Sequence, residues 1–127
     1  MPKKKDLNDR QIQDYYEALD LAKETLIDGI FKLKGRRRKA NSPGEEAEID
    51  AKILDLSADK ALLDAKRAAF KANRHAITPP TEDQLDHLGK LIEEVEELNA
   101  NTQIAQEVIA LSTDALNTFK TIHADQA

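Results

Sequence analysis

The sequence of 127 residues contains no cysteine and no tryptophan, and it has only five aromatic side chains. Without cysteine the chain cannot form a disulfide scaffold, a thiolate nucleophile or a zinc–thiolate site. It has no run of about 18 apolar residues, so we expect no membrane-spanning helix. The basic start at residues 1–6 leads into no apolar stretch, which argues against a secretory signal. We therefore expect a cytoplasmic protein with a single helical domain over residues 1–127.

The few glycines and prolines fall mostly in two stretches, residues 35–44 and 78–80, which divide the chain into three long segments. Each segment opens with a capping-box pattern, in which a cap side chain and the side chain three residues later satisfy each other's backbone N–H groups. These patterns predict an all-α protein, an antiparallel helical bundle that follows a basic tail at residues 1–7. The three capping pairs are Asn8 with Gln11, Ser42 with Glu45, and Thr81 with Gln84.

The third segment carries two apolar faces that do not line up. One face ends at Leu98 and the other begins at Ile104. On one continuous helix, at about 100° per residue, they would lie on nearly opposite sides. We expect this segment to be broken or kinked near residues 99–102, which leaves open a bundle of three or four helices. The expected helices run over about 9–34, 43–76, 82–98 and 102–123.

The second segment has two apolar rows on nearly opposite faces, which favours a position in the middle of the bundle. An alanine-rich row would allow a neighbouring helix to approach closely. The row of large side chains is Ile49, Ile53, Leu56, Leu63 and Phe70, and the second row is Leu54, Ala58, Ala61, Ala65 and Ala72.

Charge is polarised along the chain. Residues 1–40 carry 11 basic and 7 acidic side chains, whereas residues 77–127 carry 2 and 10. The basic focus is a run of six cations that either binds phosphate groups or is a solvated loop complementing a helix end. No aromatic residues interleave with it to stack on bases. This run consists of Lys32, Lys34, Arg36, Arg37, Arg38 and Lys39.

A second basic row, on the second segment, has expected partners on the acidic third segment. Folding the third segment back antiparallel across the prolines gives a rough register. It predicts ion pairs of Lys60 with Glu97, Lys71 with Asp86, and Arg74 with Asp83.

The acidic run that contains Glu93, Glu94 and Glu97 is similar to the first motif of the all-helical MazG-type nucleotide pyrophosphohydrolases. That resemblance implies a magnesium-binding nucleotide hydrolase with a second acidic pair on another helix. The second pair is missing, because Ala110 stands three residues after Glu107. The chain also lacks a Glu-x-x-His pair, a glycine-rich phosphate loop and a Gly-x-Ser-x-Gly motif. We therefore predict no catalytic, cofactor-binding or metal-ligating residues and no enzymatic activity.

These features favour a protein-binding module: an assembly adaptor, a chaperone or an acidic inhibitor-type partner that binds a protein or a second copy through an amphipathic helical face. The alternative is a nucleic-acid-binding protein that uses the basic tail and the loop at residues 32–39. The predicted interface is the rotated apolar face of the last helix, with Ile104, Val108, Leu111, Ala115 and Phe119.

Overall fold

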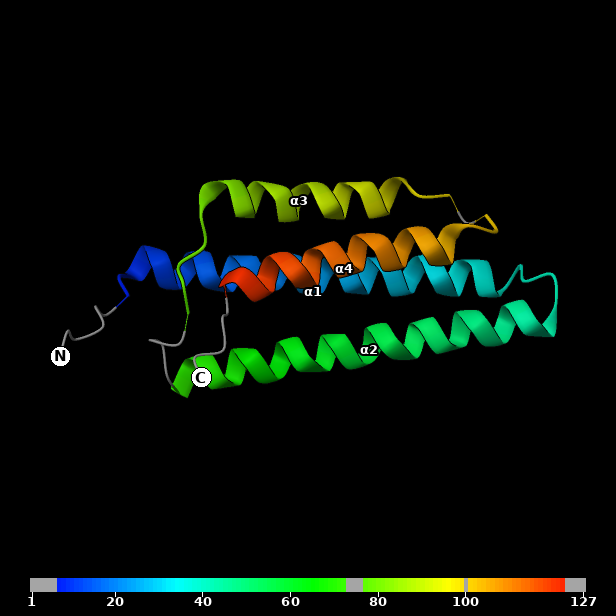
Figure 1. Cartoon of the computed structure of the whole chain (residues 1–127), viewed down its shortest axis with the longest axis horizontal. Helices are drawn as coiled ribbons and strands as arrows, with labels where there is room; N and C mark the ends of the chain where they lie inside the picture. The colour runs from blue at the N-terminus through cyan, green and yellow to red at the C-terminus, as the bar shows by residue number, and fades with distance from the viewer. Residues whose placement is uncertain (1–6, 73–76, 100, 123–127) are drawn as a thin grey trace.

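A computed structural model of the chain describes residues 7–72, 77–99 and 101–122. These residues form four α-helices and no strand, so the prediction of an all-α bundle is confirmed. The helices run alternately up and down the bundle (Figure 1). The third segment is broken where the two apolar faces change side. The helices are α1 (Asp9–Arg37), α2 (Pro43–Ala72), α3 (Glu82–Glu97) and α4 (Ile104–Ile122).

Local capping sets the starts of the helices. At Asn8 and at Thr81 the capping box is complete, with the cap side chain and the third-position glutamine each accepting a backbone N–H. At Ser42 only half of the box forms, because the Glu45 carboxylate accepts from Asn41 N instead. The first helix was expected to end near residue 34 and is longer than that. The helix continues to Arg37, with basic side chains in its last turn that complement the helix dipole.

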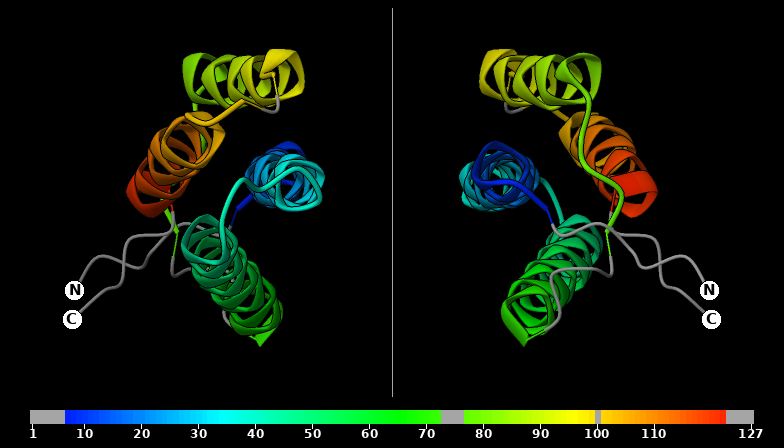
Figure 2. Two further views of the ribbon diagram at one scale, coloured as in Figure 1. Left: turned by 90° about the vertical axis from the view of Figure 1, so that its right-hand side faces the viewer. Right: turned by 90° about the vertical axis from the view of Figure 1, so that its left-hand side faces the viewer.

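Helix α1, and not α2, occupies the middle of the bundle. It packs against α2, α3 and α4, whereas α2 and α3 lie on opposite sides and do not meet within the described residues (Figure 2). Helix α1 has the broad buried face that this position requires, and α2 buries only one side chain per seven residues. The buried residues of α2 are Ile49, Leu56, Leu63 and Phe70, while its second row, Leu54, Ala58, Ala61, Ala65 and Ala72, is exposed.

Because α2 and α3 do not meet, the predicted ion-pair register between them is wrong. The charged flank of α2 pairs with α1 instead: Arg67 Nη1 lies 2.8 Å from Asp20 Oδ1, and Lys23 Nζ lies 2.6 Å from Asp64 Oδ1. Arg74, predicted to pair with Asp83, lies outside the described residues.

Helices α1 and α4 come close together at Gly29. Gly29 permits a close approach, since a Cβ built there would lie 2.8 Å from Val108 Cγ1. Toward one end of the bundle, the buried Tyr15 ring packs 4.0 Å from Phe70 and 5.8 Å from Phe119, measured between ring centroids. No helix in the described ranges is long and apolar enough to cross a membrane.

Candidate functional site

The predicted interface on α4 is occupied by the chain's own helices. Ile104, Val108, Ala115 and Phe119 are each at most 1% exposed and belong to the hydrophobic core, and only Leu111 is partly exposed. The break between α3 and α4 turns this face inward, which accounts for its rotation relative to the face of α3. The four buried side chains therefore offer no surface to a partner in this structure.

Half of the basic cluster is used to hold the bundle together. The Lys32 ammonium donates to the carbonyl oxygens of Glu96 at 2.7 Å and Leu98 at 2.9 Å, at the carboxyl end of α3. Arg36 is only 8% exposed, and its Nη2 donates to both carboxylate oxygens of Glu45, at 2.8 and 3.1 Å.

Arg37 joins the same junction between α1 and α2. It binds Asp50, and its Nη2 lies 3.0 Å from Glu46 Oε1. The hydrogen bond to Asp50 raises the pKa of Arg37 above its ordinary value, and the negative charges of Asp50 and Glu46 act in the same direction. Lys32, Arg36 and Arg37 therefore have internal partners.

The other half of the cluster faces solvent. Lys34, Arg38 and Lys39 are exposed and have no side-chain hydrogen bond or ion pair to the described residues. The basic tail, apart from Leu7, lies outside those residues. The nucleic-acid alternative remains a prediction that depends on these exposed cations and on the tail.

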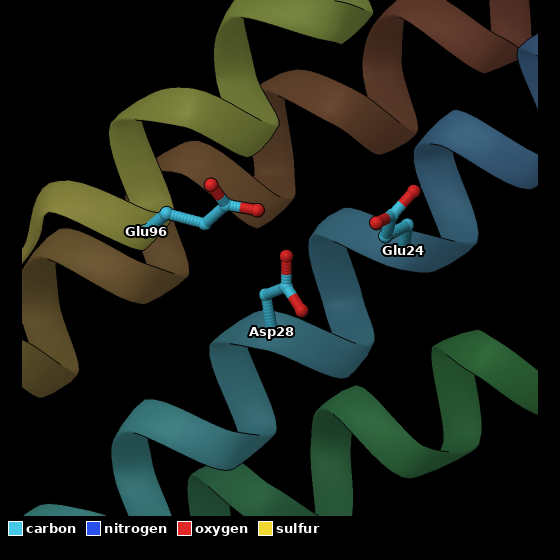
Figure 3. A group of neighbouring side chains, drawn as sticks. All are labelled: Glu24, Asp28 and Glu96. Carbon is cyan, nitrogen blue, oxygen red and sulfur yellow. The ribbon is translucent and has the colours of Figure 1, made fainter.

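An acidic cluster joins α1 and α3 (Figure 3). Glu24, Asp28 and Glu96 each contribute a carboxylate oxygen, and these oxygens lie within 4.8 Å of one another. Asp28 is the most enclosed member, and its Oδ2 is buried without a hydrogen-bond partner. Burial raises the pKa of Asp28, as do the neighbouring charges of Glu24 and Glu96, while Lys32 opposes the shift.

This cluster is better suited to taking up a proton than to enclosing a metal ion. Carboxylate oxygens are the ligands of hard divalent cations, but Glu24 and Glu96 are exposed and Lys32 places a positive charge beside the group. Sequence reasoning missed the cluster because it depends on how α1 and α3 pack. In the sequence, only the four-residue spacing of Glu24 and Asp28 indicates that two of the three carboxylates are neighbours on one helix.

The MazG-like motif does not form the acidic cluster. Glu93, Glu94 and Glu97 are exposed on α3, and none of them is part of the group around Asp28.

A row of exposed, uncharged residues follows one face of α2, which we call the outer face. Leu54 is 70% exposed at its centre, and Leu62 beside it is 48% exposed. The residues follow alternating steps of four and three, and every one is exposed. Among the described residues, no helix covers this side of α2 (Figure 2). The outer face comprises Ala47, Ala51, Leu54, Ala58, Ala61, Ala65, Ala68 and Ala72.

Compared with known proteins, the chain matches no family model, no curated protein and no solved structure. The surface of the bundle is therefore the remaining indication of function.

Proposed function

We propose that the protein is a non-enzymatic protein-binding module that binds its partner through the outer face of α2. The observation that carries the proposal is the absence of charge from this face. Charged residues make up 34% of the chain, yet none stands at any of the eight exposed positions. The solvent side of a surface helix normally carries polar and charged residues, and a contiguous apolar surface marks interaction sites.

The shape of the outer face suits a second helix. Small alanine side chains allow helix axes to approach closely, and the alternating steps of four and three keep the face on one side of a helix that is 30 residues long. Leu54 supplies a large apolar side chain, whose full burial contributes about 1.5–3 kcal/mol. Binding of one helix against another is the mode that these residues support.

Among the roles expected from the sequence, the outer face supports an adaptor better than an acidic inhibitor. The acidic helix α3 lies on the opposite side of the bundle from α2. A partner on the outer face would therefore meet alanine and leucine rather than a row of carboxylates.

A capture experiment with a matched control tests the proposal. We compare the proteins that three tagged baits retain from a cell lysate. The baits are the wild type, the double variant Leu54→Glu with Ala61→Glu, and a control, Gln106→Glu with Asn117→Glu, at exposed positions of α4. Circular dichroism first establishes that all three fold. We expect the wild type and the control to retain the same protein, identified by mass spectrometry, and the outer-face variant to lose it at least about tenfold.

The proposal fails if no retained protein depends on the outer face. An untagged copy of the chain is added to the mixture, so that self-association is detected in the same assay as binding to another protein.

A further inference from the structure

Building on the proposed function, we infer that the partner of the outer face is a second copy of this chain, bound with the two α2 helices antiparallel. The inference comes from the repeat on the outer face and from the charges that flank it. The repeat is that of a coiled-coil seam, which here runs over residues 47–72 without interruption.

An antiparallel pair places the seam in full register with itself. With the twofold axis between positions 59 and 60, residue 47 lies opposite 72 of the second copy, 51 opposite 68, 54 opposite 65, and 58 opposite 61. All eight positions meet another position of the seam, and each Leu54 lies opposite an alanine. Large side chains packed against small ones fill such a seam well.

Helix propensity alone does not explain this face. Alanine is the best helix former and is common on exposed helices. Leu54 and Leu62, however, expose 70% and 48% of their surface to solvent, and no other helix in the described part of the chain lies on that side of α2. Burial against a second copy removes both leucines from water together with the alanines.

The flanking charges favour a second copy in this orientation. On one flank, the antiparallel register brings Asp50 beside Lys71 of the second copy, and Ser57 beside Asp64 of the second copy. By symmetry each contact occurs twice. Asp50 and Lys71 are both exposed. Asp50 already binds Arg37 of its own chain, and the Lys71 ammonium of the second copy would be an additional partner for its carboxylate.

The other flank is also compatible with this register. It brings Glu48 beside Ala69 of the second copy and Asp55 beside Leu62 of the second copy. No pair of like charges lies directly opposite in the antiparallel arrangement.

A parallel pair is disfavoured by the same residues. In a parallel coiled coil each flanking position meets the opposite flank of the partner five residues further on. Asp50 would then lie beside Asp55 of the second copy, and the like-charge contact would occur twice. The charges therefore select the antiparallel orientation, as flanking charges do in coiled coils generally.

Disulfide trapping tests the orientation directly, because the chain contains no cysteine of its own. Ala51→Cys protein and Ala68→Cys protein, one of them carrying a mass tag, are mixed and oxidised mildly. We expect the 51–68 disulfide to exceed the 51–51 and 68–68 disulfides together. A dominant 51–51 disulfide would overturn the antiparallel pair. Asn117→Cys on α4 is the control, and it should give little cross-linking.

Sedimentation of the purified chain tests the association itself. We expect a dimer whose dissociation constant rises at least about 100-fold with Leu54→Glu, because a carboxylate would be buried in the seam. Lys71→Glu should raise it about three- to tenfold, with a smaller effect at high salt, since it replaces two surface ion pairs by like-charge contacts. The control Lys90→Glu on α3 should change it less than twofold.

The failure of this inference is distinguishable from the failure of the proposed function. A purified chain that stays monomeric at high concentration overturns the antiparallel dimer. The proposed function then still stands if the capture experiment retains a different protein through the outer face, and it falls if that experiment retains none.

Discussion

Helices α4 and α2 both pack on α1, but they do so in different ways. Helix α4 presents a broad apolar face, with Val108 set against the gap at Gly29 and Phe119 within the aromatic core. Helix α2 meets α1 along a narrow row with one large buried residue every two turns. Ion pairs such as Arg36 with Glu45 and Lys23 with Asp64 flank this row. Burial of apolar side chains is thus the main attachment of α4 to α1. Ion pairs contribute more to the attachment of α2 than to that of α4.

The difference follows from the size of the side chains. Burial stabilises in proportion to apolar area, about 0.8 kcal/mol for each CH₂ group. A face of isoleucine, valine and phenylalanine therefore gains much more from the core than a row of alanines. Leaving the outer face of α2 exposed in the single chain costs little by comparison, and it keeps that face available for binding.

Truncating one side chain on each helix tests most directly whether α4 belongs to the core and the outer face of α2 to the surface. Phe119→Ala on α4 should lower the free energy of unfolding by about 3–5 kcal/mol, since it empties a site next to Tyr15. Leu54→Ala on the outer face should change the stability of the monomer by less than about 0.5 kcal/mol. Urea unfolding at low protein concentration measures both. Equal losses would contradict the assignment of α4 to the core and of the outer face to the surface.

A second comparison uses two glycines of α1. Gly29→Ala should destabilise the protein by about 1–3 kcal/mol, because the new methyl group collides with the stiff, buried Val108 side chain. Gly35→Ala meets nothing within 4 Å and lies in the helix, so it should stabilise by about 0.5–1 kcal/mol. Thermal unfolding of the two variants shows whether each substitution raises or lowers the stability. If Gly29→Ala also stabilises, α1 and α4 are not closely packed there.

Most of the fold could be predicted from local patterns. The capping boxes at Asn8 and Thr81 form as expected, and the change of face near residues 99–102 marks a real break between α3 and α4. These signals depend on neighbours in the sequence, and local hydrogen bonds and periodicity are enough to read them.

The arrangement of the helices could not be predicted in the same way. The sequence shows a second apolar row on α2 and a rotated apolar face on α4, but not which of the two α1 covers. The prediction exchanged the two: it placed the alanine row inside and the face around Val108 outside. The acidic cluster was missed for a related reason, since Glu96 and Asp28 come together only when α3 packs on α1.

The contribution of charge to the attachment of α2 can be tested at the junction with α1. Arg36→Ala should cost about 1–3 kcal/mol of unfolding free energy, because the mostly buried Glu45 carboxylate loses its charged partner and keeps only the Asn41 N–H. Arg38→Ala, at an exposed position two residues later, should cost less than about 0.5 kcal/mol. Urea unfolding measures the free energy of unfolding of both variants. Similar costs for both variants would mean that the Arg36 contact contributes nothing to holding α2.

The smallest expected effect concerns the third neighbour of α1, at the carboxylates shared with α3. Asp28→Asn should raise the unfolding free energy at pH 7 by about 0.5 kcal/mol, because it removes a like charge four residues from Glu24. The control Asp86→Asn, on an exposed position of α3, should leave stability within about 0.3 kcal/mol.

The pH dependence gives the sign of this effect independently. Since the pKa of Asp28 is raised on folding, the folded state binds more protons between the unfolded value of 3.8 and the raised value. The stability of the wild type should therefore fall, relative to Asp28→Asn, as the pH rises through that window, and the difference should be constant above it. A variant less stable than the wild type at pH 7 would show that the Asp28 carboxylate has a stabilising partner, and that charge between α1 and α3 attracts as it does between α1 and α2.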